Sequence, residues 1–432
     1  MDDTLGSKPQ IEPATIATLR RRLLPFLFLL YVVAFLDRIN IGFAALTMNR
    51  ELGVSTQQFG FLVGVFFFGY FLLEIPSNLL LHKLGARVWI ARIMLTWGVV
   101  AIASGFVRSV DQLYVARFLL GVAEAGFFPG IILYLTYWFP KRERARAIAL
   151  FMIAQPVTSI LGGPLSGVIL DRVHWMGVGS WRWLLILEGF PALVGGVLTY
   201  ALLPNGPAEA RYLTEGEKLA IATELASEQR EASGARELSV SLALRHRGVW
   251  HLAAVGILQA VGLYTLSFWT PQVIKALSSV YTNTIVGLLV TIPNVAGLFA
   301  MLLVAHRSDR VRERRQHIAI PLTVGGMAFI ALASSRSPIS SIALLSLVAF
   351  GAYGFFGPFF ASVSGLLGGI AGATTIALVT SVSNLGGFVG PYLVGLIARR
   401  TGNLNGGLVL AGCSMILSAA LALFLPRRTH VT

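Results

Sequence analysis

Twelve apolar segments, each long enough to cross a lipid bilayer as a helix, constrain the fold of this chain more than any other feature. Hydrophobic residues make up 55% of the chain and charged residues only 12%, which is too apolar for a soluble protein of this length. Inside a bilayer the backbone must satisfy its own hydrogen bonds, and helices do so. The sequence therefore predicts an all-α polytopic membrane protein. The spans begin near Leu24, Gln57, Val88, Gln112, Arg146, Trp183, Val249, Asn283, Ile318, Ile339, Gly368 and Leu404.

A polar stretch divides the spans into two groups of six, and an even total keeps both termini on one side. Lysine and arginine concentrate in the tails, in the polar stretch and in alternate loops, which predicts cytoplasmic termini. We read the first span as retained rather than as a signal peptide, because it is longer than a signal h-region. The expected units are a cytoplasmic tail (1–22), a six-helix half (23–203), a cytoplasmic loop (204–247), a second half (248–426) and a C-terminal tail (427–432).

Within the polar stretch, Thr214-Glu215-Gly216-Glu217 is typical of a capping box. It predicts a short amphipathic helix that ends near Ser233-Gly234. Two roles are open for this helix: a solvated connector between the halves, which its charge pattern favours, or a regulatory element.

Composition also excludes several functions. The single cysteine, Cys413, excludes an intrachain disulfide, and the seven histidines are scattered without metal-ligand spacing. The net charge of +14 follows mostly from the membrane topology, so we expect no nucleic-acid partner. Because no nucleophile and base pair is visible either, we expect neither an enzyme nor a metal protein.

Several ionisable residues lie inside apolar spans, where each charge costs roughly 2.5 to 3.5 kcal/mol on insertion scales, and four of them belong together. Asp37 and Arg38 are adjacent in the run 23–46, and Arg117 and Glu124 lie about two helical turns apart on one face of their span. Together they form a formally neutral set in the N-terminal half. A structural salt bridge is the plainer reading, and a substrate or proton pathway is the functional one.

The two halves contain an internal repeat. Gly163-Pro164 recurs as Gly390-Pro391, and Gly126-Phe127-Phe128 recurs as Gly354-Phe355-Phe356. Repeated motifs at corresponding helices predict two six-helix units that face each other, with a binding site between them near the bilayer midplane.

Two loops at corresponding places read NLLLHKLGAR (78–87) and SDRVRERR (308–315). Further motifs are 37–42 (DRINIG), 74–78 (EIPSN), 117–126 (RFLLGVAEAG) and 384–388 (NLGGF). With these motifs, the whole chain resembles the major facilitator superfamily, and within it the anion:cation symporter group. The first loop is similar to the superfamily's signature loop, but Asn78 and His82 stand where glycine and aspartate are usual, and in the second copy Arg312 stands in the glycine position.

The group includes tartrate, phthalate, hydroxyphenylacetate and sugar-acid permeases, so the resemblance implies a transporter of organic carboxylates in a bacterial inner membrane. An arginine suits this substrate, because its planar fork can bind a carboxylate through two hydrogen bonds. We expect Arg38 to grip the substrate and Arg117 to orient Glu124 or Asp37 and release it on protonation, as the resemblance also implies. Tyr70, Gln155 and Asn384 match the group's substrate-site positions.

Other polar residues are weaker pore candidates. Tyr70, Glu74 and Asn78 form a polar stripe on one helix, and we expect a structural hydrogen-bonding role for Glu74. We expect Glu188 to be a helix-packing acid rather than a coupling site. The C-terminal half contains no comparably central ionisable group, and its polar candidates are Gln259, Tyr264, Trp269, Asn294, Ser381, Ser383 and Asn384.

The neutral set suggests how transport is driven. If Asp37 or Glu124 takes up a proton, the set becomes net positive, and a bound organic monoanion restores neutrality. We therefore expect a symporter that imports a small organic anion by alternating access, with protons as the coupling ion, no cofactor, and the lipid-embedded monomer as the functional unit. Two alternatives are an efflux antiporter for an anionic metabolite or drug and a non-transporting membrane sensor of an organic acid.

Overall fold

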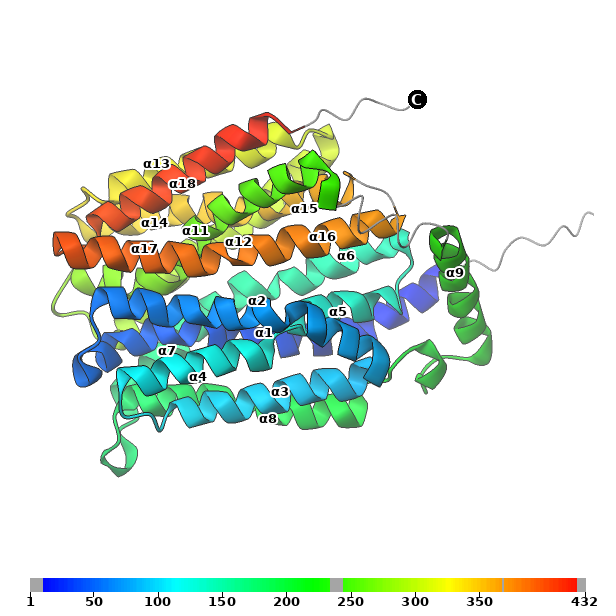
Figure 1. The fold of residues 1–432 in the computed structure, drawn as a ribbon, viewed down its shortest axis with the longest axis horizontal. Helices are drawn as coiled ribbons and strands as arrows, with labels where there is room; N and C mark the ends of the chain where they lie inside the picture. The colour runs from blue at the N-terminus through cyan, green and yellow to red at the C-terminus, as the bar shows by residue number, and fades with distance from the viewer. Residues whose placement is uncertain (1–10, 234–243, 367–368, 426–432) are drawn as a thin grey trace, which may run out of the picture.

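The computed structural model describes residues 11–233, 244–366 and 369–425, and the regular structure in these ranges is helical. The predicted tail 427–432 lies outside the described residues. Most helices run side by side along the long axis of the molecule (Figure 1). The α-helices are α1 (Pro13–Leu52), α2 (Thr56–Leu84), α3 (Ala86–Ser104), α4 (Val110–Glu124), α5 (Phe127–Thr136), α6 (Lys141–Met152), α7 (Ala154–Arg172), α8 (Ser180–Leu202), α9 (Glu215–Ser233), α11 (Arg247–Ala276), α12 (Asn283–Val311), α13 (Arg315–Leu332), α14 (Pro338–Gly354), α15 (Phe356–Ser364), α16 (Gly369–Asn384), α17 (Gly386–Thr401) and α18 (Asn405–Leu423). Two short 3₁₀ helices, η1 (Trp175–Gly177) and η2 (Pro207–Glu209), lie in connections.

The described residues contain 11 helical stretches long and apolar enough to cross a membrane. The helix α13 is not among them, because its short length includes the polar residues 315–317 at its start. It nevertheless packs along α14 and α18 in the same bundle (Figure 1). Each of the twelve predicted spans thus coincides with a described helix, and the prediction of an all-α polytopic membrane fold is confirmed.

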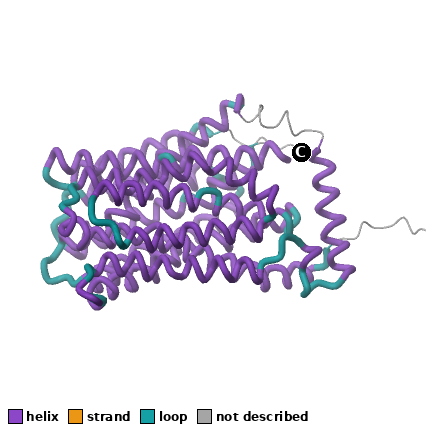
Figure 2. The backbone as a smooth tube through the Cα atoms, turned by 60° about the horizontal axis from the view of Figure 1, so that its bottom comes forward, coloured by secondary structure: helices purple, strands orange, loops and turns teal. Residues whose placement is uncertain are grey.

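The first helix is longer than its apolar part. It begins at Pro13, ahead of the apolar run, and its first turns meet α9, which lies across one end of the bundle (Figures 1 and 2). The Thr15 hydroxyl donates to Glu217 at 2.7 Å. The predicted capping box is present, since the Thr214 N–H donates to the Glu217 carboxylate at 2.8 Å and the Glu217 N–H donates back to the Thr214 hydroxyl at 3.3 Å.

Acidic side chains of α9 fasten it to the N-terminal half. Glu224 lies 3.5 Å from Arg142, and Glu228 lies 3.4 Å from Arg144. Glu228 also accepts from the N–H of Lys141 at 2.8 Å, which places a carboxylate at the N-terminus of α6, where the helix dipole favours negative charge. The connector is therefore docked on the half that precedes it.

Four of the predicted spans are broken in two, which the sequence reading did not anticipate. The breaks fall between α4 and α5, α6 and α7, α14 and α15, and α16 and α17. The first occurs at Gly126, whose φ of +86° is a left-handed conformation that favours glycine. A Cβ atom there would also lie 2.3 Å from the hydroxyl of Ser77. Three of these breaks place polar side chains in the middle of the bundle, as described below.

Two seams join the halves, one between α7 and α12 and the other between α2 and α17. In the first, the backbones approach so closely that a Cβ on Gly163 would lie 2.8 Å from the carbonyl oxygen of Gly287. In the second, a Cβ on Gly60 would lie 2.3 Å from the carbonyl oxygen of Pro391. Small residues allow such packing in membranes. The repeated Gly-Pro elements of the sequence thus occupy corresponding places in the two seams.

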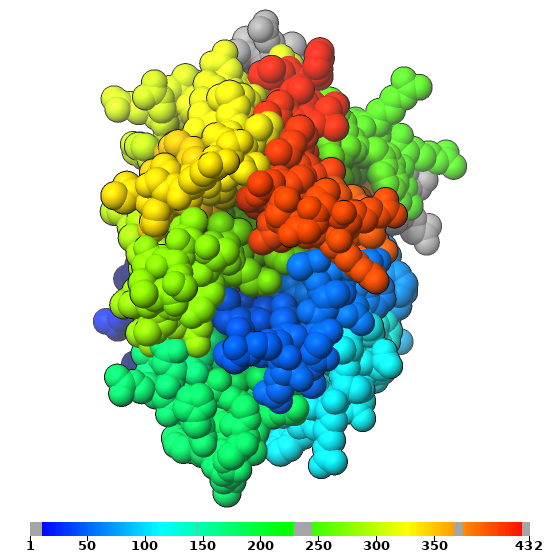
Figure 3. Space-filling model, turned by 90° about the vertical axis from the view of Figure 1, so that its left-hand side faces the viewer, coloured from blue at the N-terminus to red at the C-terminus, as the bar shows by residue number. Residues whose placement is uncertain are grey.

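At the end opposite α9, hydrogen bonds tie the halves together. Asp171, near the end of α7, accepts the N–H groups of Asn283 and Thr284 at 3.1 and 2.7 Å, and so caps the N-terminus of α12. Arg399 on α17 donates to Gln57 on α2 at 2.7 Å. Seen end-on, segments of both halves meet across this face (Figure 3). We call it the closed end.

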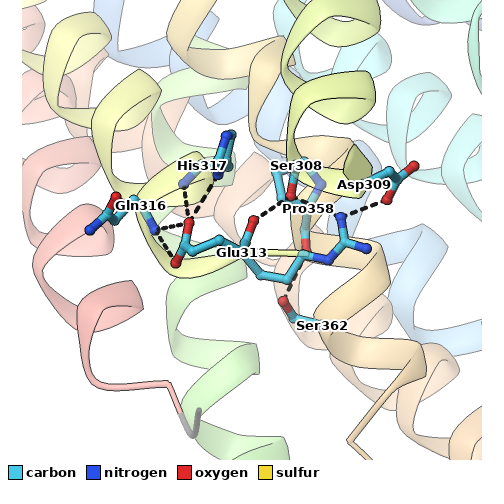
Figure 4. A network of polar contacts seen from close by, with 8 residues as sticks. Ser308, Asp309, Glu313, Gln316, His317, Pro358 and Ser362 are labelled. Atoms are coloured by element: carbon cyan, nitrogen blue, oxygen red, sulfur yellow. Dashed lines mark hydrogen bonds and ion pairs between the residues drawn. The ribbon is translucent and has the colours of Figure 1, made fainter. Parts of the chain in front are cut away.

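The turn between α12 and α13 contains a strained residue. Arg312 has a φ of +54°, in the left-handed region that non-glycine residues rarely adopt. A polar network holds the turn (Figure 4), in which Arg314 donates to the Ser308 hydroxyl at 2.8 Å and to Asp309 at 2.6 Å. Glu313 accepts the N–H of Gln316 at 3.0 Å. Burial raises the pKa of Glu313, but hydrogen bonds from Gln316 and His317 outweigh it, so its pKa lies below the usual value.

Arg312→Gly should make the protein more stable. Glycine adopts the left-handed backbone conformation without the cost of about 1–2 kcal/mol that other residues pay. It also loses more conformational entropy on folding, so the free energy of unfolding should rise by only about 1 kcal/mol. Thermal unfolding of the purified protein in detergent would measure it. The matched control is Arg310→Gly, which removes a neighbouring arginine from a helical position and should destabilise. Equal effects of both substitutions would contradict the role of backbone conformation.

Asp171→Ala should loosen the closed end, because removing a helix cap costs about 1 kcal/mol. Spin labels at Trp175 and Val280, both exposed at this end, would report the separation of the halves in a Cys413→Ser background. The variant should show a larger population of long distances than the parent, and Asp171→Asn, which keeps one acceptor oxygen, should fall between them. An unchanged distance distribution in Asp171→Ala would show that the cap does not hold the two halves together at the closed end.

Candidate functional site

A buried ion pair joins Arg38 on α1 to Glu124, the last residue of α4. The side chain of Arg38 is 9% exposed and that of Glu124 is 1% exposed. The second carboxylate oxygen of Glu124, Oε2, is buried without a hydrogen-bond partner. Because the break after Glu124 ends the helix there, its carboxylate can face α1 in the middle of the bundle. The pair is the charged centre of the candidate site.

Asp37, the neighbour of Arg38, is held by neutral donors. The indole N–H of Trp97 on α3 donates to its Oδ2 at 2.7 Å, and the amide of Asn40 donates to its Oδ1 at 3.1 Å. Asp37 as a whole is 1% exposed, and its carboxyl group interacts electrostatically with Arg117. Hydrogen bonds from neutral donors favour the ionised form of a buried carboxyl.

Arg117 is a desolvated cation without a direct carboxylate partner among the described residues. It is 2% exposed, and its Nε and one terminal nitrogen have no hydrogen-bond partner. Its guanidinium lies 5.3 Å from the ring centroid of Phe66 and interacts electrostatically with both Asp37 and Glu124. The structure thus places Arg117 near both acids, while the ion pair of Glu124 is made with Arg38.

Aromatic rings surround the guanidinium of Arg38. It lies 5.2 Å from the ring centroid of Phe66, 5.9 Å from that of Phe67 and 5.4 Å from that of Tyr70. All three rings come from α2, and each lies within the range of a cation–π interaction. Tyr70, a predicted substrate contact, is therefore next to the predicted substrate-gripping arginine.

The side-chain amides of Gln155 and Asn384, both predicted substrate contacts, are each hydrogen-bonded to a tyrosine that lies near Arg38. Gln155 donates to the hydroxyl of Tyr31 at 2.6 Å, and the hydroxyl of Tyr264 donates to Asn384 at 3.5 Å. Tyr31 and Tyr264 both interact electrostatically with Arg38, and Tyr264 also makes a hydrogen-bonding contact with it. Gln155 and Asn384 lie beside the helix breaks of α6–α7 and α16–α17. Both halves therefore contribute to the surroundings of Arg38.

The weaker candidates separate into two groups. Glu74 on α2 is buried, interacts electrostatically with Arg38 and makes a hydrogen-bonding contact with Ser381 of the other half. Two other candidates, Gln259 and Ser383, bond to backbone carbonyls of the C-terminal half. Gln259 donates to the carbonyl of Ala352 at 2.9 Å, and Ser383 donates to the carbonyl of Val379 at 2.6 Å.

Two further candidates of the C-terminal half, Trp269 and Asn294, lie near the boundary between the halves. Trp269 is fully buried and packs edge-on against Phe59, with ring centroids 5.1 Å apart. Asn294 accepts from the hydroxyl of Tyr353 at 3.3 Å and donates to Val290 at 2.9 Å. A cavity of about 20 Å³, lined by Asn294 together with residues of α1, α7 and α11, lies between the halves and has room for about one water molecule.

Sequence reasoning missed three residues that order the site: Tyr31, Asn40 and Trp97. Asn40 lies inside the quoted motif 37–42, and its position three residues after Asp37 puts both on one helix face. The signal for Trp97 was weaker, because a buried indole N–H needs an acceptor but the sequence does not say which. Tyr31 lies two turns before Arg38 on the same helix and could have been included on that ground.

The described residues contain no group of three or more His, Cys, Asp or Glu side chains that could hold a metal ion. The arrangement places a carboxyl group that can gain or lose a proton, that of Glu124, beside the permanent cation of Arg38. Arg38 can bind either its internal partner Glu124 or an external anion, and a proton on Glu124 would weaken the first choice.

Comparisons with known proteins identify the family of this chain. A family model described as Major Facilitator Superfamily matches residues 27–391. A protein of Agrobacterium vitis named "Putative tartrate transporter" is 44% identical over 421 residues, which cover 96% of this chain and 92% of that protein. A "Quinolone resistance transporter" of Acinetobacter baumannii is 35% identical over 410 residues, which cover 95% of this chain and 94% of that protein.

Solved structures share the fold. A bacterial homologue of the human lysosomal transporter Spinster, in an inward-facing and occupied conformation, matches with a TM-score of 0.74 at 18% identity over 97% of each chain. At this identity the likeness shows the fold alone. The family model, however, spans most of this chain, and the relatives above cover nearly all of it. The chain is therefore a multi-pass transport protein and not an enzyme, and it belongs to the Major Facilitator Superfamily.

Proposed function

We propose that this protein imports a small organic carboxylate together with protons across a bacterial inner membrane. The observation that carries the proposal is the buried ion pair of Arg38 and Glu124, next to Asp37 and Arg117. Two cations and two acids form a neutral set at low dielectric. Adding one proton and one monoanion leaves the set neutral, whereas adding either alone does not. Binding of each therefore favours binding of the other.

Competition for Arg38 supplies the coupling step. While Glu124 is ionised it occupies the guanidinium, and a substrate carboxylate would have to displace it. Uptake of a proton by the two acids, which titrate as a unit, neutralises Glu124 and frees Arg38 for the substrate. Arg117 stays close to both acids and keeps the neighbourhood positive. We expected Arg117 to orient Glu124 or Asp37. In the structure Glu124 pairs with Arg38, and Arg117 interacts electrostatically with Asp37, so the proposal gives Arg38 both the acid and the anion as partners.

In this proposal, alternating access uses the two seams. The excess of basic residues predicts that the α9 end faces the cytoplasm, so the closed end faces outward in this conformation. Opening requires the capped helix α12 to separate from α7 and α17 to separate from α2. Substrate and protons would then reach the central set from outside when these seams part.

The named relatives bear on the substrate. The "Putative tartrate transporter" supports a carboxylate, and tartrate is the first probe to test. Because tartrate is a dianion near neutral pH, the same charge balance requires two protons for each tartrate. Efflux is the second candidate function, because the "Quinolone resistance transporter" is similar over nearly the same length. Both alternatives keep Arg38 as the anion-binding group and differ in the direction of the proton gradient that drives accumulation.

Proteoliposomes containing the purified protein would test the proposal. An inward proton gradient should accelerate tartrate accumulation, and Glu124→Gln should abolish the gradient's effect while retaining some exchange of internal for external substrate. Glu215→Gln, which neutralises an exposed acid of α9, is the matched control and should behave like the parent. Accumulation driven only by an outward gradient would favour efflux, and normal proton coupling in Glu124→Gln would remove this residue from the coupling step.

Arg38→Lys should weaken tartrate binding at least about tenfold, because lysine keeps the charge but loses the two-point fork. Isothermal titration calorimetry on the purified protein would measure the affinity. Arg108→Lys, at an exposed connection, is the control and should leave binding unchanged. If tartrate does not bind to the parent, a thermal-shift screen with dicarboxylic, sugar and aromatic acids identifies the substrate. Parent-like affinity in Arg38→Lys would exclude Arg38 from the binding site.

A further inference from the structure

Glu188 on α8 is a buried acid outside the four-residue set. It is 1% exposed, and the Ser166 hydroxyl on α7 donates to its Oε1 at 2.8 Å. Its other oxygen, Oε2, has no conventional hydrogen-bond partner. The amide of Asn40 on α1 makes a hydrogen-bonding contact with the carboxyl group. Sequence reasoning assigned this residue only to helix packing.

No cation faces Glu188 among the described residues. The helices packed against α8 are α1, α3 and α7. From α7 the contact is Ser166, and beside Gly189 the side of α3 offers Ala101 and Ile102. From α1 the groups are Asn40 and Asp37, and the electrostatic effect of Asp37 on Glu188 is that of a like charge. An isolated buried carboxylate costs far more than a neutral acid, so the site favours a bound proton.

Asn40 connects this acid to the coupling set. It is fully buried, and its amide nitrogen donates to Asp37 Oδ1 at 3.1 Å. The same amide therefore lies between two carboxyl groups that cannot easily both be charged. One of them, Asp37, has Trp97 as a second donor and Arg117 as a nearby cation. The other, Glu188, has the Ser166 hydroxyl as a second donor but no nearby cation among the described residues.

We propose that Glu188 stays a neutral carboxylic acid and acts as a positioning residue, which orients Asn40 so that Asn40 stabilises ionised Asp37. The four-residue set then keeps its balance of two positive and two negative charges. An ionised Glu188 would make the region net negative and oppose anion binding. This inference rests on the proposed function for its role in coupling, but the protonation of Glu188 can be measured without transport.

Infrared difference spectroscopy on the purified protein at neutral pH tests the protonation directly. Glu188→Gln removes one carboxyl group without changing its shape. The parent-minus-variant spectrum should show loss of the carbonyl stretch of a protonated carboxylic acid. Loss of carboxylate stretches instead would overturn the proposal. Glu215→Gln is the control, because this exposed acid should give only a carboxylate difference. The result stands whether or not the protein transports tartrate.

The pH dependence of tartrate uptake tests the positioning role. Glu188→Gln should keep the parent's pH midpoint, because the amide replaces a neutral acid. Glu188→Leu and Asn40→Leu should each move the midpoint up by about one pH unit, since Asp37 loses support for its ionised form and binds protons more tightly. A shift in Glu188→Gln as large as in Glu188→Leu would contradict the proposal. If the leucine variants fail to fold, the glutamine variant and the infrared measurement still decide it.

Discussion

The cost of burying charge in a low-dielectric interior governs the centre of this protein. Arg38, Arg117, Asp37 and Glu124 are all nearly inaccessible to solvent, and none is tolerable there alone. The structure meets this cost with an ion pair, two neutral hydrogen-bond donors and a cage of aromatic rings. The same balance gives the site its chemistry, since a neutral set can accept a proton and an anion together more easily than either alone.

Breaks in the membrane-spanning helices position the polar residues around the four-residue charged set. Glu124 and Asn384 end their helices, and Gln155 lies at the start of another. A broken helix inside a membrane protein is tolerated where its backbone faces other protein segments or a cavity, and such breaks are typical of transporter binding sites. The seams at α7–α12 and α2–α17 contain small residues, which let the backbones of the two halves lie close together.

Two acids that look alike in the sequence have different environments. Glu124 and Glu188 each lie in an apolar span. In the folded protein Glu124 contacts Arg38, whereas Glu188 contacts Ser166 and Asn40. The proposals therefore give Glu124 an exchanging proton and Glu188 a permanent one. The connector helix α9 also shows how position sets role, because its acids bind arginines of the N-terminal half rather than solvent alone.

The sequence by itself determined the membrane fold, the helix positions, the capping box of α9 and the residues of the charged set. These follow from local quantities: apolar length, side-chain periodicity and the cost of a charge in a span. Only the tertiary structure decided that Arg38 rather than Arg117 pairs with Glu124, that Trp97 and Asn40 hold Asp37, and that Gln259 and Ser383 bond to nearby backbone instead of meeting Arg38. Partner choice depends on the rotation and crossing of helices distant in the chain, and a one-dimensional pattern does not contain those angles.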